Sequence, residues 1–390
     1  MKDSLKLDLY LGLMLIYALS EAILGSGYIV TFSRWPLFFI SLYYYLKVMM
    51  GVKKEPFFIS ALGLLYMMFF IYGVIVIFEG KEFHVWRTDN RTMRSFSYLL
   101  QITDSLLPIF VFYYFSKIKV LTANYVQNRM PMFLLVVGIC YYVNLQNNIL
   151  EKGTDEVTNN SGYLVLSIFP MLLFLKARSW KQYLFVGICL VLIFLSMKRG
   201  AILISLLCFA VYFYYLLGNS KNTVPVIAIL LIMVVSIYIG YEHLMSSNDY
   251  FQERVNKTLD GNSNGRDVIF FFFYNYFLHR TTQEEFLIGK GANATLEIFG
   301  QYAHNDWLEI MINQGLFGLV VYLIYWWSFL LLCKKKHIVP QIKTALIILF
   351  VIYFMKTIFS MSYRDYTVYS TMTLGYCVAM SYARVHDRYN

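Results

Sequence analysis

The sequence predicts an all-α, polytopic integral membrane protein with about twelve transmembrane helices. Apolar residues make up 59% of the 390 residues and charged residues only 14%. A water-soluble domain usually has about 25% charged residues. The apolar residues also gather in stretches near the roughly 20 residues that one membrane-spanning helix needs. Composition and segment length together exclude a chain of soluble domains.

Twelve apolar segments follow one another along the chain, with one long polar stretch among them. The segments are residues 9–27, 31–50, 57–78, 96–116, 130–150, 162–177, 183–198, 201–218, 224–241, 307–333, 342–361 and 366–383. We therefore expect three parts: transmembrane helices one to nine in 1–241, a large external loop in 242–306, and helices ten to twelve with the C-terminus in 307–390.

The distribution of charge predicts the orientation of these helices. An even number of spans places both termini on one side, and on that side we count eighteen Lys and Arg residues against four acidic residues. Since cytoplasmic loops are enriched in basic residues, both termini are expected in the cytosol. The net charge of +10 is then a sign of topology and gives no support for a nucleic-acid partner. Residues 1–8 are expected to lead into a retained first helix, not a cleaved signal peptide.

One aromatic segment inside the long loop, Val268 to Leu278, is too short to span the membrane. Eleven helical residues reach about 17 Å, whereas the hydrocarbon core is about 30 Å thick. Phe and Tyr favour the membrane boundary, so we expect a short interfacial helix along the outer leaflet.

Five cysteines and three ionisable residues lie within the predicted spans. The cysteines are Cys140, Cys189, Cys208, Cys333 and Cys377. Without CxxC spacing they are expected to pack in the core and to form neither disulfides nor metal ligands. Glu21, Asp104 and Lys356 are costly inside a membrane. Asp104 and Lys356 lie at similar depths, so they could form a structural ion pair or, alternatively, part of the ion pathway of a transporter.

The long external loop is the place with enough polar sequence to form a site. Its basic residues Arg254, Lys257, Arg266, Arg280 and Lys290 have acidic neighbours, so charge alone does not single out one of them. The run from Gly289 to Gly291 does not fit a phosphate-binding loop, because the glycine required five residues earlier is replaced by Glu284.

His304 lies where the loop meets the tenth span. Asp306 and Glu309 have the spacing of a capping box, with Asp306 as the N-cap residue. This leaves His304 just outside a helix N-terminus at the outer membrane surface. There the imidazole could be a surface or packing residue, or it could act as a general base near neutral pH.

Lys198, Arg199 and Gly200 form a short turn between the seventh and eighth spans. These cations could simply stabilise the C-terminus of the preceding helix. They could also form an anion site, since Arg binds phosphate through paired hydrogen bonds and stays charged when it is partly buried.

In this order the motifs resemble the bacterial O-antigen polymerase and O-antigen ligase superfamily. The motifs are the basic turn at 198–201, Gly265-Arg266 early in the loop, Gly289 to Gly291, and His304-Asn305 followed by a Gly-x-x-Gly at 315–318. They cover roughly residues 195–320, and the remaining chain resembles the superfamily in hydropathy. Lys290 departs from the small or apolar residue that is common at its position.

The resemblance implies a membrane glycosyltransferase that works on the external side without a metal or other cofactor. Its donor would be a glycan on undecaprenyl diphosphate, and its acceptor a sugar hydroxyl. If the roles of the superfamily's motif residues apply to the matching positions, Arg199 and Arg266 would stabilise the diphosphate and His304 would be the general base. Lys198, Lys290, Arg280 and Asn305 are expected to contact the diphosphate or the lipid carrier.

Within the superfamily we favour a polymerase of lipid-linked repeat units in O-antigen or capsule synthesis. A ligase that transfers the glycan to a lipid A core is the alternative, and a polyprenyl-linked glycan flippase or another secondary transporter is the alternative from a different class. The expected location is the bacterial cytoplasmic (inner) membrane. The expected partners are the lipid-linked donor and acceptor, the bilayer and a chain-length regulator protein.

Overall fold

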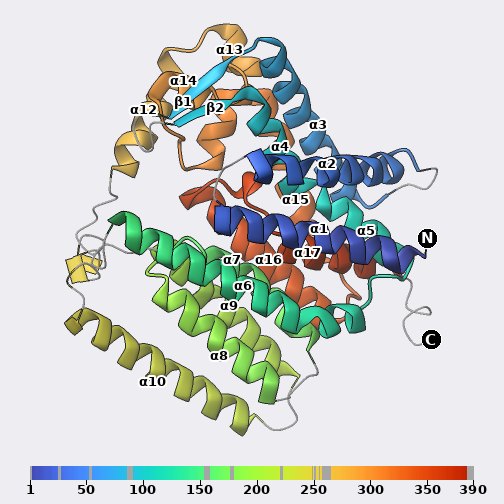
Figure 1. Cartoon of the computed structure of the whole chain (residues 1–390), viewed down its shortest axis with the longest axis vertical. Helices are drawn as coiled ribbons and strands as arrows, with labels where there is room; N and C mark the ends of the chain where they lie inside the picture. The colour runs from blue at the N-terminus through green and yellow to red at the C-terminus, as the bar shows by residue number, and fades with distance from the viewer. Residues whose placement is uncertain are drawn as a thin grey trace.

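The computed structural model describes residues 2–24, 28–51, 55–85, 91–152, 159–175, 180–219, 223–247, 249, 252–253, 255–256 and 265–383. These residues form a helical bundle in which long helices lie side by side (Figure 1). The predicted all-α membrane class is confirmed. One small addition is a two-stranded antiparallel hairpin, in which Glu82 pairs with Arg94 and Val85 with Arg91.

The elements follow the hydropathy of the sequence closely. They are α1 (Asp3–Leu24), α2 (Tyr28–Met49), α3 (Phe57–Phe78), β1 (Glu82–Val85), β2 (Arg91–Arg94), α4 (Ser95–Leu106), α5 (Pro108–Lys117), α6 (Ala123–Lys152), α7 (Gly162–Ile168), η1 (Phe169–Phe174), α8 (Trp180–Leu195), α9 (Arg199–Gly218), α10 (Val224–Ser247), α12 (Arg266–His279), α13 (Gln283–Ile288), α14 (Ala294–Phe299), α15 (Asp306–Lys334), α16 (Pro340–Phe359), η2 (Ser362–Arg364) and α17 (Val368–Tyr382).

Within the described residues, each of the twelve predicted apolar segments falls largely on a helix, and two of them are divided into two helices at a proline. Pro108 begins α5 directly after α4, and Pro170 lies at the start of the 3-10 helix η1 that follows α7. Proline lacks the N–H that would continue the preceding helix. Within the described residues, seven helical segments are long and apolar enough to cross a membrane: α1, α3, α4 with α5, α6, α9, α15 and α16. The number of twelve crossings stays a prediction.

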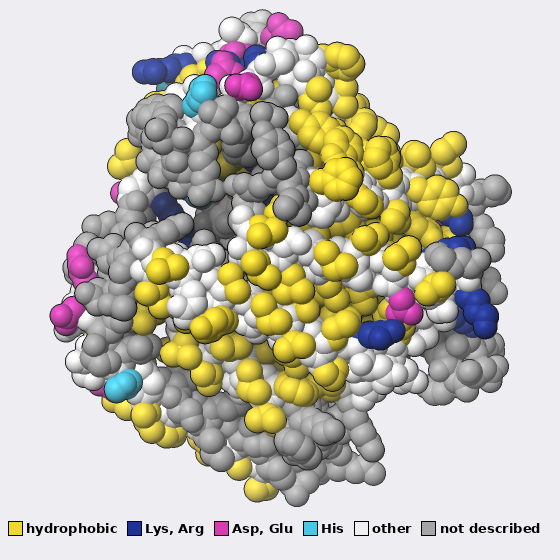
Figure 2. Space-filling model, viewed as in Figure 1, with side chains coloured by type: hydrophobic (Ala, Val, Ile, Leu, Met, Phe, Trp, Pro, Cys, Tyr) yellow, Lys and Arg dark blue, Asp and Glu magenta, His cyan; other side chains and the backbone are white. Residues whose placement is uncertain are grey.

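Apolar side chains cover much of the surface between the charged ends of the bundle (Figure 2). Large residues on several helices are more than half exposed, among them Phe32, Leu135, Val191 and Tyr238. A soluble monomer rarely exposes an apolar surface of this extent. Such a surface is instead typical of helices in contact with lipid.

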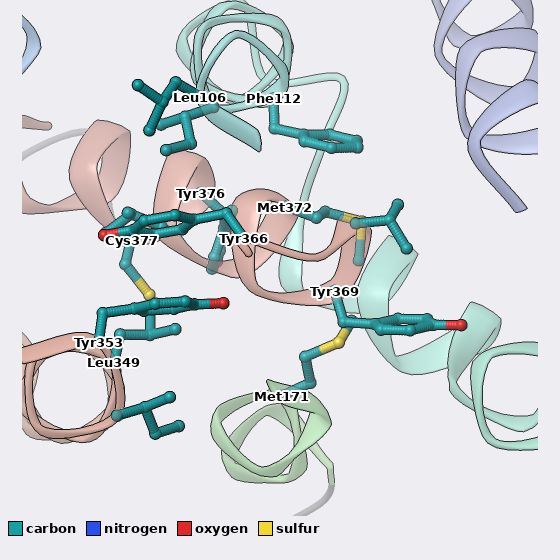
Figure 3. Packing of buried hydrophobic residues seen from close by; sticks show 14 of the residues in the cluster. Leu106, Phe112, Met171, Leu349, Tyr353, Tyr366, Tyr369, Met372, Tyr376 and Cys377 are labelled. Carbon is teal, nitrogen blue, oxygen red and sulfur yellow. The ribbon is translucent and has the colours of Figure 1, made fainter. Parts of the chain in front are cut away.

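The core of the bundle is centred on α17, which packs against α5 and α16. Figure 3 shows side chains of these helices and of η1 meeting around it. The rings of Tyr353 and Tyr366 stack with centroids 3.7 Å apart, and the hydroxyl of Tyr366 lies 2.6 Å from that of Tyr325. All five cysteines are buried and free, as predicted.

The predicted pair between Asp104 and Lys356 is wrong. Asp104 forms its salt bridge with Arg34 of α2, and Lys356 forms one with Asp365 in the connection between η2 and α17. Similar depth in the membrane does not place two residues on facing sides of a bundle. In the structure α4 packs against α2, so the nearest cation to Asp104 comes from that helix.

Gly375 allows α17 to approach α5 at the distance of backbone contact. A Cβ atom at this position would lie 2.7 Å from the Tyr113 nitrogen and 2.9 Å from the Ile109 oxygen. Small residues at such crossings let membrane helices pack closely. By contrast, a Cβ at Gly138 in α6 would have nothing within 4 Å.

We expect Gly375→Ala to lower the thermal unfolding temperature in detergent, because the added methyl group forces α17 and α5 apart. Overpacking of this kind costs about 1–3 kcal/mol. Gly138→Ala is the matched control and should leave the temperature unchanged or raise it, since Ala favours a helix over Gly by about 0.8–1.0 kcal/mol. Equal unfolding temperatures for the two variants would contradict the tight packing at Gly375.

Candidate functional site

Three short helices, α12 to α14, pack against the first part of α15. Ile269, Phe273 and Phe277 on one face of α12 are buried in a small core with residues of α14 and α15. The opposite face of α12 carries exposed apolar residues, including Phe271, which is 61% exposed. This helix contains the aromatic segment predicted to be interfacial. Arg254, Lys257 and Asn264 of the same loop lie outside the described residues.

The Gly289 to Gly291 motif attaches the loop to a break in α15. Gly315 has φ of 64° and ψ of −159° inside α15, a conformation that L-residues with side chains rarely adopt. The break leaves the carbonyl oxygens of Ile312 and Asn313 free to accept hydrogen bonds from the N–H groups of Lys290 and Gly291, at 2.9 and 3.0 Å. A Cβ at Gly289 would lie 2.3 Å from the Asn313 oxygen. The glycine motifs of this region therefore permit close backbone packing.

The predicted capping box at the start of α15 is wrong. Asn305 is the N-cap residue, and its side chain accepts a hydrogen bond from the Leu308 N–H at 3.2 Å. Asp306 is fully buried and instead accepts hydrogen bonds from the Ser362 N–H at 2.9 Å and from the Tyr322 hydroxyl at 2.5 Å. Asn caps helices as well as Asp does, which leaves Asp306 free to bind the segment between α16 and α17.

Glu309 is also fully buried and holds the residues before α15 in place. Its carboxylate accepts hydrogen bonds from the Thr295 hydroxyl at 2.5 Å, the Ala303 N–H at 2.9 Å and the Asn313 amide at 3.3 Å. Ala303 directly precedes His304. The loop around His304 is thus tied to α15 on one side through Glu309 and on the other through the Asn305 cap.

His304 lies between these two attachments in a left-handed conformation, with φ of 52°. Such a conformation costs roughly 1–2 kcal/mol for a residue with a side chain, and the neighbouring hydrogen bonds maintain it. Burial, together with the positive charges of Arg266 and Lys198, lowers the pKa of His304 to about 4. The imidazole is therefore neutral at pH 7, and positively charged side chains lie near it.

Arg266 and Lys198, whose charges act on His304, lie at the starts of two different helices. Arg266 is the first residue of α12, and the preceding Gly265 has φ of 77°, which favours glycine. Lys198 is the N-cap residue of α9. The structure thus brings together three of the predicted site residues, which lie far apart in the sequence.

Tyr163 of α7 lies between these residues and the ion pair of Lys356 with Asp365. The positive charge of Arg266 and the negative charge of Asp365 both act on Tyr163. The Lys356 ammonium lies 5.0 Å from the centroid of the Tyr163 ring and is bonded to Asp365. A Cβ at Gly200 would be only 2.2 Å from the Tyr163 hydroxyl, so the glycine of the basic turn makes room for this tyrosine. We call the six residues His304, Lys198, Arg266, Tyr163, Lys356 and Asp365 the His304 cluster.

Arg364 stabilises the other side of the loop that carries His304. It donates a hydrogen bond to the Asn293 side chain at 2.7 Å. Its guanidinium carbon lies 4.8 Å from the ring centroid of Tyr98, 4.9 Å from that of Tyr302 and 5.3 Å from that of Tyr363. Cation–π contacts of this kind stabilise a desolvated guanidinium. Arg364 therefore joins η2 to the loop two residues before His304.

The other predicted site residues lie in different environments. Arg199 is the half-buried first residue of α9, next to Lys198. Lys290 forms a 3.2 Å salt bridge with Glu297, which also interacts with Lys81. Arg280 is exposed at the end of α12 opposite Arg266, about 21 Å away along a helix of this length. Asn305 uses its side-chain oxygen as the helix cap.

Three residues in and around the cluster, Tyr163, Arg364 and Asp365, were not predicted as site residues from the sequence. One signal could have found the last two: they are adjacent charged residues in the very short connection between the last two apolar segments, on the side where basic residues are scarce. Tyr163 carries no such signal among 34 tyrosines. Among the residues that the structure describes, no group of three or more His, Cys, Asp or Glu side chains could hold a metal ion.

The fold and the cluster define an integral membrane protein with a basic, histidine-containing site at one end of a helical bundle. Residues 184–323 match the sequence model of the family described as O-antigen ligase. The match confirms the resemblance to the O-antigen ligase and polymerase superfamily, whose members are glycosyltransferase-like enzymes, and with the apolar helices it indicates a bacterial inner-membrane protein. It includes Lys198, Arg266 and His304. No curated protein matches the chain.

We expect Arg266→Gln to raise the pKa of His304 above about 4, because the substitution removes a positive charge that disfavours the imidazolium. The measurement is a pH titration of histidine-labelled protein by NMR in nanodiscs, which is tractable because the chain has six histidines. Arg280→Gln, at the far end of α12, is the control and should leave the pKa unchanged. An unshifted His304 in Arg266→Gln would show that the two side chains do not interact.

Proposed function

We propose that the protein polymerises glycan repeat units linked to undecaprenyl diphosphate, with the His304 cluster as its active site. The observation that supports this proposal is the neutral imidazole of His304 beside Arg266 and Lys198. Two fixed cations provide a binding site for a diphosphate, and a neutral imidazole can accept a proton. Both groups lie at the end of the bundle that, by the distribution of charge, faces the exterior.

In the proposed reaction, an acceptor hydroxyl oxygen attacks the anomeric carbon of the donor glycan. The bond between that carbon and the diphosphate oxygen breaks, and undecaprenyl diphosphate leaves with the electron pair. His304 takes the proton of the attacking hydroxyl. Arg266, Arg199 and Lys198 stabilise the negative charge that develops on the leaving diphosphate.

Binding of the donor would also adjust the basicity of His304. The positive charges of Arg266 and Lys198 contribute to the lowered pKa of the free protein. A bound diphosphate brings negative charge next to these cations and offsets their effect, which raises the pKa of the imidazole towards its ordinary value near 6.5. His304 would therefore become the stronger base when a donor is present.

The membrane position of the cluster suits a substrate with a prenyl chain. The diphosphate of such a substrate stays at the membrane surface because its lipid lies in the bilayer. Directly after Arg266, α12 presents the exposed apolar side chains of Val268 and Phe271, which are 64% and 61% exposed. We infer that this face of α12 covers the lipid or lines its entry.

We expect His304→Ala and Arg266→Ala each to reduce chain growth by about 10²-fold or more, because each removes a group that acts in the transition state. The assay uses purified protein with lipid-linked repeat units, with and without a chelator, and growth of the native protein should not depend on the chelator. His279→Ala, an exposed histidine at the end of α12, is the control and should retain activity. Native rates in a folded protein with both His304→Ala and Arg266→Ala would overturn the mechanism.

The family description favours ligase activity as a second candidate. We propose the polymerase because the external loop is modest in size and the chain is rich in Tyr and Phe. Both reactions need the same donor and the same chemistry at His304, and they differ in the acceptor. A ligase would transfer the glycan to a lipid A core.

Deletion of the gene in a Gram-negative host separates the two activities. We expect lipopolysaccharide that carries one repeat unit, because ligation continues when polymerisation stops. Electrophoresis of the extracted lipopolysaccharide gives the measurement, and the intact gene on a plasmid should restore the ladder of longer chains. A lipid A core without any repeat unit would instead identify the protein as the ligase.

A further inference from the structure

A cavity of about 440 Å³ adjoins the His304 cluster on the side of α1, α2 and α4. Its polar lining includes Glu21, Arg34, Gln101, Tyr302 and Asp365. The volume lies within the range of about 300–1,000 Å³ that is usual for small-molecule sites. The mechanism proposed above leaves this cavity unused.

Each cation of this cavity already lies against an anionic or aromatic group, which makes the cavity a poor site for a diphosphate. Arg34 is in a salt bridge with Asp104, and Arg364 is bonded to Asn293 and covered by tyrosine rings. Asp365 is likewise paired with Lys356. The carboxylate of Glu21 lies near the Tyr17 hydroxyl and adds a further acidic group. The Nε and Nη1 atoms of Arg364 are buried without a hydrogen-bond partner among the described residues, so they are available as donors to a sugar hydroxyl.

The lining offers the groups that recognise an uncharged sugar. Glu21 and Asp104 supply acceptors for sugar hydroxyls, and Gln101 supplies both a donor and an acceptor. One oxygen of Asp104 is buried without a hydrogen-bond partner. The tyrosine rings of Tyr17 and Tyr302 provide flat apolar surfaces for the ring of a sugar.

The cavity is placed to present such a sugar to His304. Tyr302, which lines it, precedes His304 by two residues. Asp365 lines it too and is bonded to Lys356, which lies against Tyr163 in the cluster. A sugar held here would lie beside the loop segment that carries the general base.

We propose that this cavity binds an uncharged sugar of the acceptor glycan and orients its hydroxyl towards His304, a role that rests on the function proposed above. Of the residues that line the cavity, Tyr302 alone falls within the segment 184–323 that matches the family model. Helices α1, α2 and α4 and the connection between the last two helices would therefore determine which acceptor is used.

Protection of single cysteines from a thiol reagent tests the proposal. Gln101→Cys is introduced together with His304→Ala, which prevents turnover, and the purified protein in nanodiscs is labelled with a membrane-impermeant methanethiosulfonate. The five native cysteines are buried, so the background is low. The probe is the repeat-unit oligosaccharide freed from its lipid, which can bind only through its sugars, with or without saturating undecaprenyl diphosphate.

We expect the oligosaccharide to slow labelling of Gln101→Cys about tenfold, with undecaprenyl diphosphate present or absent. Glu284→Cys, exposed on α13, is the matched control and should be labelled at one rate in every condition. If Gln101→Cys does not fold, Met361→Cys in the same cavity replaces it.

Two results would overturn the proposal. Unprotected cysteines would show that no sugar enters the cavity, and protection that disappears with undecaprenyl diphosphate would assign the sugar to the donor. Chain growth by the native protein is measured separately, because it tests the proposed polymerase activity and not the role of the cavity. If chains grow while the cysteines stay unprotected, only the assignment of the cavity fails.

Discussion

The buried carboxylates of Asp306 and Glu309 hold together the segments that surround His304. Each accepts hydrogen bonds from a different part of the chain: Asp306 from the connection after α16, and Glu309 from the residues before α15. A buried carboxyl group without hydrogen-bond partners is strongly unfavourable, so the segments and the two side chains stabilise one another. The N-terminus of α15 further favours negative charge, and Arg364 adds a nearby positive one. The position of His304 follows from this arrangement.

The sequence predicts well those features that depend on composition and on local backbone geometry. Apolar segments of suitable length became helices because a backbone in lipid must satisfy its hydrogen bonds within the segment. The motifs at Gly265, Gly289 and Gly315 likewise marked real conformational requirements, since all three residues have positive φ. His304, Arg266 and Lys198 could be proposed together because they belong to motifs in a recognisable order.

The partners of charged residues could not be predicted, because depth in a membrane says nothing about which side of a helix a residue faces. Asp104 forms a salt bridge with Arg34 and Lys356 forms one with Asp365, whereas Asp104 and Lys356 do not pair with each other. The spacing of Asp306 and Glu309 fits a capping box, yet Asp306 is bonded to the distant Ser362, and Glu309 is bonded to Thr295 and Ala303 before the helix. The cavity could not be foreseen either, because its lining comes from residues that are far apart in the sequence.

The break at Gly315 fixes how far the two carboxylates of α15 lie from the point where the loop is attached. Upstream of it, the first part of α15 carries Asp306 and Glu309, and at the break the loop from Gly289 to Gly291 bonds to the freed carbonyl groups. One residue added between Glu309 and Gly315 would rotate both carboxylates by about 100° relative to that attachment. The stretch from Glu309 to Gly315 therefore acts as a spacer of fixed length between the two carboxylates and the point where the loop is attached.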